Sequence, residues 1–157
     1  MNTRFTCQLW QQPNFRAVNK FYRSQKHKGS ASGDESIFVI YQDAEINDHC
    51  DKASEPLSNE PELVAAVRLV PHDNYYWLRS LYIKQELRGQ NLGSELLAFV
   101  HQHITLPIYC FPYTHLEQFY GRAGYELVTP EQLPQSLNQL FERYQGKGQS
   151  ILAMAKL

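Results

Sequence analysis

Residues 81–94 read LYIKQELRGQNLGS and join two apolar segments through a loop that contains Gly89 and Gly93. The apolar side chains before the loop predict a strand over residues 76–83. The spacing of the apolar side chains after it predicts a helix over residues 92–103. The first turn of a helix leaves backbone N–H groups unpaired and carries a partial positive charge, and glycine lets a ligand approach the backbone closely. The stretch therefore predicts a strand, a tight loop and a helix with an anion site between them.

Arg88 adds a cation to this loop, and its planar fork of donors suits phosphate. A diphosphate is the anion that this arrangement favours, although a purely structural tight turn would produce the same two glycines. The loop is not the phosphate-binding loop of NTPases, because no Gly-Lys-Ser/Thr follows it. It is also a poor dinucleotide fingerprint, because the preceding strand belongs to an antiparallel pair and not to a βαβ unit.

The residues before this stretch predict further strands and one helix. Strands are expected over residues 4–9, 37–41, 63–70 and 76–83, a helix is expected to start near Pro13, and residues 26–33 read as a loop. Asp73 and Asn74 are typical turn residues, so the two strands on either side of them are expected to pair antiparallel.

The residues after the stretch alternate between short strands and helices. Strands are expected over residues 107–111, 125–128 and 150–155, and helices over residues 116–123, closed by Gly124, and from Pro134 to about Gly146. The whole order predicts a mixed α/β fold around one central sheet.

The chain has 157 residues, of which 43% are hydrophobic and 20% are charged, which is enough for one domain over residues 1–157. Residues 42–61 are rich in acidic side chains, contain two prolines and read as a long polar loop between two strands. The formal net charge of −1 makes nucleic acid an unlikely partner, because charge alone would not attract it.

Membrane and secretory signals are not found in the sequence. No apolar run approaches the ~20 residues that span a membrane, and Met1 to Trp10 lacks the apolar segment of a signal peptide. Cys7, Cys50 and Cys110 are scattered and form no Cys-x-x-Cys pair. We expect a cytoplasmic protein, monomeric or homodimeric, with no membrane partner.

Two segments resemble the sequence motifs of the GCN5-related N-acetyltransferases. Residues 81–94 are similar to motif A of that family, whose loop has the form Gln/Arg-x-x-Gly-x-Gly/Ala. Residues 116–125, LEQFYGRAGY, are similar to motif B, commonly Phe-Tyr-x-x-x-Gly-Phe. The two motifs stand in the family's order and separation, and the resemblance covers residues 63–128 well. It implies a single-domain α/β (mixed α+β) fold with a mostly antiparallel mixed sheet flanked by helices.

The resemblance implies that acetyl-CoA is the co-substrate and that its acetyl group moves to a primary amine by direct attack in a ternary complex. The pyrophosphate would be held by the loop residues Arg88, Gly89, Gln90, Asn91, Leu92, Gly93 and Ser94. The strand residues Leu81, Tyr82 and Ile83 would pair with the pantetheine arm, and a main-chain N–H there would polarise the thioester carbonyl. The acceptor would be a small-molecule or peptide amine. A non-catalytic acyl-CoA sensor is the alternative function.

Tyr120 matches the motif B tyrosine that protonates the leaving thiolate, and it is the implied catalytic residue. A core tyrosine on an amphipathic helix is the plain structural alternative. Asn91 stands where the family has its middle glycine, and we expect the loop to keep its shape because asparagine tolerates a left-handed backbone. The asparagine that often precedes motif B is missing.

The base that would deprotonate the amine is not indicated, because residues 75–80 contain no carboxylate. Candidates are Glu35, His72, Asp73 and His115, or a water path.

Packing is the expected role of Cys110. The histidine pair His101 and His103 is not expected to bind metal, because residues two apart point to different helix faces. His49 and Cys50 have no further ligands at metal-site spacing, so no metal is expected there either. Arg122 is either a phosphate contact or a surface charge. The aromatic side chains Phe21, Tyr22, Tyr41, Tyr75, Tyr76 and Trp77 either line an acceptor pocket or pack on strand faces.

Overall fold

The computed structural model describes residues 4–43 and 60–157. Its helices are α1 (Arg16–Ser24), α2 (Leu92–His103), α3 (Glu117–Arg122) and α4 (Gln135–Gly146). Its strands are β1 (Phe5–Leu9), β2 (Ser36–Gln42), β3 (Glu62–Pro71), β4 (Tyr76–Ile83), β5 (Ile108–Cys110), β6 (Glu126–Leu127) and β7 (Met154–Lys156). Short 3-10 turns η1 (Gln85–Leu87), η2 (Thr114–Leu116) and η3 (Pro130–Gln132) connect them.

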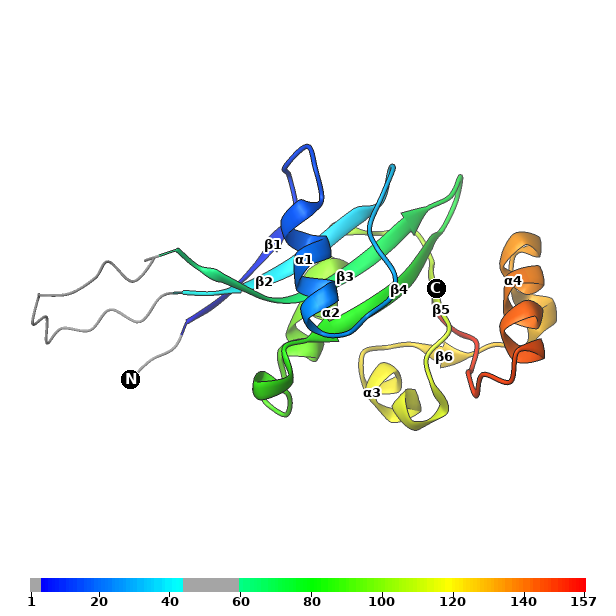
Figure 1. Cartoon of the computed structure of the whole chain (residues 1–157). Helices are drawn as coiled ribbons and strands as arrows, with labels where there is room; N and C mark the ends of the chain where they lie inside the picture. The colour runs from blue at the N-terminus through cyan, green and yellow to red at the C-terminus, as the bar shows by residue number, and fades with distance from the viewer. Residues whose placement is uncertain (1–3, 44–59) are drawn as a thin grey trace, which may run out of the picture.

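The strands form one sheet in the order β1-β2-β3-β4-β5-β7-β6 (Figure 1). Strands β1 to β4 form an antiparallel meander, as the turn residues at Asp73 and Asn74 predict. Strand β5 runs parallel to β4, and the remaining pairs are antiparallel. The prediction of a mixed α/β fold with a mostly antiparallel sheet flanked by helices is therefore confirmed.

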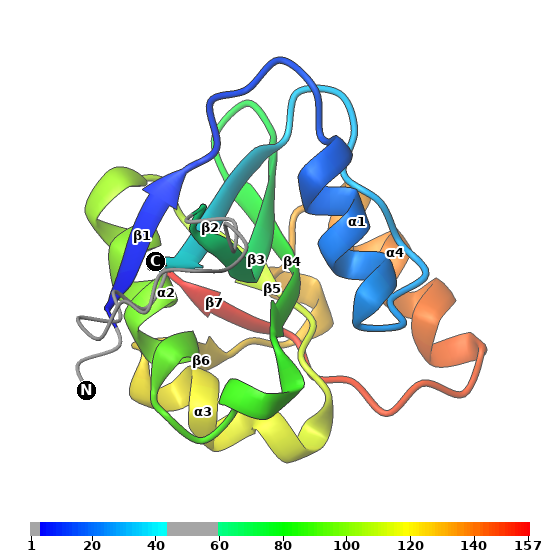
Figure 2. The same cartoon turned by 60° about the vertical axis from the view of Figure 1, so that its left-hand side comes forward.

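Helices cover both faces of the sheet. Figure 2 shows α1 and α4 on the same side of it. The opposite face packs on α2 and α3 through the largest apolar cluster, which includes Leu96, Leu97 and Tyr120. The α1/α4 face has two smaller clusters, one under α1 around Val18 and Tyr22 and one under α4. Because these two clusters are separate, the part of the sheet between α1 and α4 is left for polar side chains.

Element boundaries differ from the sequence-based expectation at three places. Helix α1 begins at Arg16, where the side-chain oxygen of Asn14 accepts the Arg16 N–H at 3.1 Å. Strand β6 is only two residues long. The last strand was expected over residues 150–155, but β7 covers Met154–Lys156. Ile151 makes only an isolated bridge to Tyr113 before β7 begins. The predicted 42–61 loop lies largely outside the described residues, which stop at residue 43 and resume at residue 60.

Strand β4 has two irregularities that create a site. Ala66 of β3 lies opposite Tyr82 and Arg68 lies opposite Arg79, so two residues of β4 bulge outward opposite one residue of β3. Ser80, at this bulge, has a left-handed φ of 58°. The second irregularity is the end of the pairing between β4 and β5. Residues 76–78 pair with residues 108–110, and the following residues of β4 do not pair with β5. The two parallel strands therefore separate beyond Leu78.

Candidate functional site

A cavity of about 860 Å³ opens where β4 and β5 separate. Its walls include Leu78, Cys110 and Tyr120 from the face of the sheet that α2 and α3 cover. They also include Trp77 and Tyr144 from the face that α4 covers. Because side chains of both faces line one space, the cavity crosses the sheet through the gap between the two strands. A ligand on one face can thus meet a ligand on the other.

The glycine loop and the N-terminus of α2 form one wall of this cavity. Asn91 is the residue before α2 and has a left-handed φ of 68°, as expected from its tolerance of that conformation. Gly89 has a φ of +88°, which strains any residue with a side chain. Arg88 is held against the loop because its Nε donates to the carbonyl oxygen of Ile83 at 3.1 Å. The loop is therefore preformed, with the first backbone N–H groups of α2 facing an open space.

Gly93 has a different reason to be glycine. A Cβ atom placed there would lie 3.0 Å from Cζ of Phe119, which is tighter than most real Cβ contacts, so the ring would have to shift slightly. The first turn of α2 thus sits directly on α3, and the ring of Phe119 in turn meets the ring of Tyr120 edge-on at 5.0 Å. The loop and the motif B helix are one packed unit.

The residues implied by the resemblance gather around this cavity. Those that border it are Leu81, Tyr82, Ile83, Arg88, Gly89, Asn91, Leu92, Gly93, Ser94 and Tyr120. Gln90 is exposed and does not border it. Arg122 does border it.

Tyr120 reaches the cavity wall from α3 while it remains 6% exposed. Burial raises the pKa of its hydroxyl, and neighbouring Cys110 raises it further, so the phenol is fully protonated at neutral pH. Burial also raises the pKa of the Cys110 thiol. A protonated thiol is a poor nucleophile, so Cys110 acts through packing.

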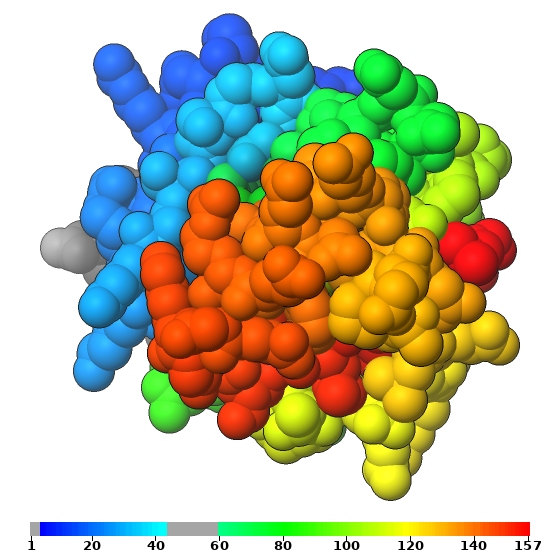
Figure 3. Space-filling model, turned by 90° about the vertical axis from the view of Figure 1, so that its right-hand side faces the viewer, coloured from blue at the N-terminus to red at the C-terminus, as the bar shows by residue number. Residues whose placement is uncertain are grey.

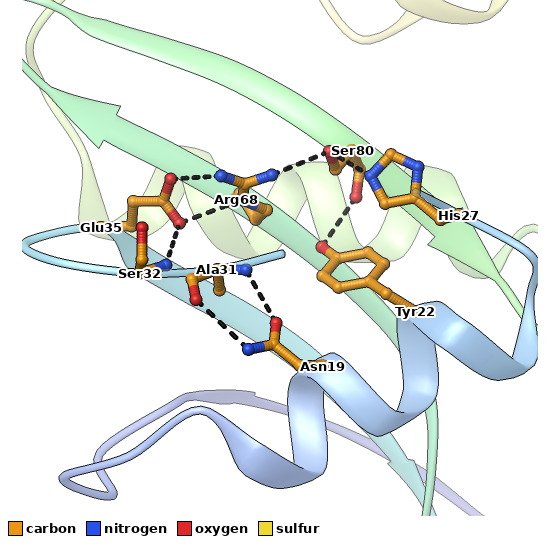
Figure 4. Close-up of polar contacts among 8 residues, drawn as sticks. All are labelled: Asn19, Tyr22, His27, Ala31, Ser32, Glu35, Arg68 and Ser80. Atoms are coloured by element: carbon orange, nitrogen blue, oxygen red, sulfur yellow. Dashed lines mark hydrogen bonds and ion pairs between the residues drawn. The ribbon is translucent and has the colours of Figure 1, made fainter. Parts of the chain in front are cut away.

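A polar cluster lies on the other face of the sheet, behind the β4 bulge (Figure 4). Arg68 forms a bidentate ion pair with Glu35, with Nε 3.0 Å from one carboxylate oxygen, and both side chains are at least nine-tenths buried. The Arg68 guanidinium also approaches the Ser80 hydroxyl at 3.4 Å. The same hydroxyl lies 2.9 Å from Nε2 of His27, and the Ser80 carbonyl oxygen accepts a hydrogen bond from Tyr22 at 2.8 Å.

His27 borders the cavity, although no sequence pattern indicates this position. It lies in the polar 26–33 segment, which has no apolar period to orient a side chain. Its ring packs 4.6 Å from the Tyr82 ring and 5.1 Å from the Tyr22 ring. Burial lowers the pKa of His27, and the cations Arg68 and Arg79 lower it further. The imidazole is therefore neutral at pH 7 and able to accept a proton.

The four candidate bases lie in different surroundings. Glu35 does not border the cavity, and its carboxylate is occupied by Arg68 and by the backbone N–H of Ser32. His72 and Asp73 lie at the turn between β3 and β4, away from the cavity walls. His115, in η2, borders the cavity.

Most of the aromatic side chains named above pack on strand faces. Within the described chain, Trp77 alone of those six borders the cavity. Tyr22 contributes by its hydrogen bond to Ser80, while Phe21, Tyr41 and Tyr75 belong to the clusters under α1 and α4. Figure 3 shows the face that α4 covers, with the segment after α1 beside it.

Residues 4–43 and 60–157 contain no cluster of three or more histidine, cysteine, aspartate or glutamate side chains placed to hold a metal ion. Across the same ranges, every helix is too short or too polar to cross a membrane.

Comparisons with known proteins agree with this geometry. The model of the acetyltransferase (GNAT) domain family matches residues 33–127. No curated protein matches the chain.

Solved structures share the fold at low sequence identity. An acyl-CoA N-acyltransferase from Pseudomonas aeruginosa is 17% identical, with a TM-score of 0.60 over 99% of this chain and 100% of that one. An aminoglycoside 6'-N-acetyltransferase complexed with coenzyme A is 13% identical, with a TM-score of 0.60 over 96% of each chain. N-acetylglutamate synthase from Neisseria gonorrhoeae, complexed with coenzyme A and N-acetyl-glutamate, is 10% identical, with a TM-score of 0.64. That match covers 99% of this chain but 35% of the synthase.

Proposed function

The chain belongs to the GNAT family of acetyltransferases, and from this premise we propose that it moves the acetyl group of acetyl-CoA to a primary amine by direct attack in a ternary complex. The observation that carries the proposal is the single cavity that crosses the sheet at the fork between β4 and β5. Such a cavity lets two substrates meet from opposite faces, so no covalent intermediate on the enzyme is needed.

The face with the glycine loop suits the co-substrate. The N-terminal N–H groups of α2 and the guanidinium of Arg88 supply donors for a diphosphate, and the side-chain-free Gly89 leaves space beside them. Residues 81–83 have no β5 partner, so their outward main-chain groups, apart from the Ile83 carbonyl oxygen that accepts from Arg88, are available to an extended pantetheine arm. Acetyl-CoA supplies the activated acetyl group, and these residues hold it.

Two side chains handle protons on either side of the reacting carbonyl. The amine attacks the thioester carbon, its N–C bond forms, and the C–S bond then breaks with the electron pair going to sulfur. Tyr120 borders the cavity and donates its phenolic proton to that thiolate, because burial keeps the phenol protonated at neutral pH. On the α1 side, neutral His27 accepts the proton that the amine loses.

The bulge at Ser80 explains how the carbonyl could be polarised. A left-handed residue inside a strand interrupts the regular hydrogen bonding between β4 and β3. Nearby N–H groups of β4 are thereby turned away from β3. These groups lie beside the cavity, where an N–H donor stabilises the developing oxyanion.

The test is thiol release from acetyl-CoA across a panel of amines, with coenzyme A binding measured separately by calorimetry. We expect turnover with at least one amine, and Tyr120→Phe should lower kcat about 100-fold with little change in coenzyme A affinity. Tyr125→Phe is the matched control, because Tyr125 is equally buried, bonds to His101 at 3.0 Å and does not border the cavity. Tight coenzyme A binding with no turnover on any amine would favour the non-catalytic sensor, and no coenzyme A binding would contradict both.

A further inference from the structure

Arg79 is a half-buried cation in the cavity wall on the α1/α4 face. Its Cζ atom lies 4.5 Å above the ring of Trp77, so the guanidinium is fixed over an aromatic face. Burial lowers the pKa of Arg79, and the positive charge of Arg68 lowers it further. Its side chain makes no hydrogen bond and no ion pair with any residue that the structure describes. A partly desolvated guanidinium thus keeps its donors unused inside a substrate cavity.

No carboxylate of the described residues forms an ion pair with Arg79. No aspartate or glutamate from residues 4–43 or 60–157 borders the cavity. The charge of the buried carboxylate Glu35 raises the pKa of Arg79, but both Glu35 oxygens are already engaged by Arg68. The other arginines of the wall, Arg88 and Arg122, are exposed and stand on the glycine loop and on α3. The uncompensated positive charge of the α1/α4 side therefore resides on Arg79.

We propose that Arg79 binds a carboxylate of the acceptor, so that the acceptor is an amino acid, a primary amine that carries its own carboxylate. This inference rests on the proposed acetyl transfer and names its substrate class. A guanidinium fork pairs with a carboxylate through two parallel hydrogen bonds, and the pair gains strength when both partners leave water. Trp77 below the guanidinium limits the movement of the fork and so favours that contact.

The position of Arg79 in β4 limits the distance between the two groups of the acceptor. Arg79 directly precedes Ser80 at the bulge, and residues 81–83 follow as the stretch offered to pantetheine. A carboxylate held by Arg79 is consequently close to the transferring carbonyl, and the acceptor that matches is one whose amine and carboxylate are a few bonds apart, as in an α-amino acid. The wall would repel a polyamine or another polycation, because its described residues offer cations and no carboxylate.

The same charges assist deprotonation of the amine. Cations near an ammonium group lower its pKa, so the site favours the neutral amine that attacks. His27, which faces Arg68, Arg79, Tyr22, Tyr82 and Ser80, is held neutral by this environment and is free to take the proton.

The experiment compares α-amino acids with their carboxamides, which keep the amine and lose the anion. Calorimetric titration onto the protein loaded with coenzyme A measures binding, and thiol release from acetyl-CoA measures kcat/KM. We expect both to favour the amino acid by about 10- to 100-fold. Arg79→Met, which keeps the aliphatic stem over Trp77, should abolish that preference, and Arg79→Lys should restore part of it. Arg143→Met, on the exposed surface of α4, is the matched control and should keep the full preference.

The outcomes separate this inference from the proposed transfer. Turnover with neutral or polycationic amines and no preference for the carboxylate would overturn the inference and leave the transfer intact. Carboxylate-selective binding that depends on Arg79, without acetylation, would support the carboxylate site and contradict the transfer. A preference that survives in Arg79→Met would place the carboxylate elsewhere and overturn the assignment to Arg79.

Discussion

The hydroxyl of Tyr22 donates a 2.8 Å hydrogen bond to the carbonyl oxygen of Ser80, which links the first helix to the bulge of β4. Tyr22 is fully buried, while Ser80 has a left-handed φ of 58°. A non-glycine residue in that conformation persists only where its surroundings hold it. Here the carbonyl is held by Tyr22, and the hydroxyl of Ser80 lies 2.9 Å from His27. Helix α1 thus fixes the strand geometry on which the proposed active site depends.

Removal of this one hydroxyl should therefore affect stability and turnover together. Tyr22→Phe leaves the Ser80 carbonyl without its donor and should lower the free energy of unfolding by about 1 kcal/mol in urea denaturation. The loosened bulge should also lower kcat about 10-fold, because it misplaces the groups that orient the substrates. Tyr41→Phe, whose ring packs against the same apolar cluster, is the control and should change neither value much. A Tyr22→Phe enzyme with full kcat would mean that the bulge does not depend on α1.

The buried pair of Glu35 and Arg68 should be costly to break from one side. Glu35→Ala leaves the Arg68 charge without its partner and should cost about 3–5 kcal/mol of unfolding free energy. Replacing both, as Glu35→Ala with Arg68→Met, should recover much of that loss. Glu62→Ala breaks the exposed pair with Lys84, whose Nζ lies 2.7 Å from Glu62, and should cost under about 1 kcal/mol. Equal losses for the buried and exposed pairs in denaturant titrations would show that Glu35 does not compensate a buried charge.

The proposed proton-accepting role of His27 predicts the acid side of the pH profile. A base works in its neutral form, and the pKa of His27 is lowered from 6.5, so kcat/KM should stay constant through neutral pH and fall only below about pH 6.5. His27→Gln should lower kcat/KM about 100-fold and remove this acid limb. Because the Arg79 cation helps to lower the pKa of His27, Arg79→Met should move the limb to higher pH.

His115→Gln is the control for this profile, since His115 borders the same cavity from η2. It should keep the acid limb in the measured dependence of kcat/KM on pH. If the limb persists in His27→Gln and disappears in His115→Gln, then the proton leaves through His115 and not through His27.

The sequence predicted those parts of the site that depend on local conformation. The left-handed backbone of Asn91 was expected because asparagine tolerates it, and φ is 68°. The tight loop before α2 was expected from Gly89 and Gly93. These features are set by a few neighbouring residues, so a local pattern carries them.

The features that were missed depend on contacts between distant residues. Arg68 is a single charge on a buried face of an apolar strand, and this could have signalled a hidden partner, but nothing in the sequence indicates Glu35 as that partner. The bulge at Ser80 has no local signal, because a serine in a strand is ordinary and its strain is supported by Tyr22 and His27 from another element. His27 joins the cavity because the segment after α1 packs against Ser80 and Tyr82 of β4, which are distant from it in the sequence.

The contact between Gly93 and Phe119 gives a steric test of how the co-substrate loop and the Tyr120 helix are coupled. In Gly93→Ala the new Cβ would begin 3.0 Å from Cζ of Phe119, so the ring must shift, and the ring meets Tyr120 edge-on. We expect about 1–3 kcal/mol of lost stability, weaker coenzyme A binding in calorimetry and a lower kcat. Adding Phe119→Leu removes the obstructing ring atoms and should restore coenzyme A binding. Gly121→Ala is the matched control, because a Cβ there meets nothing within 4 Å and its helical position favours alanine. If Gly93→Ala binds coenzyme A as tightly as the unaltered enzyme, the close approach of α2 to α3 is not what shapes the loop.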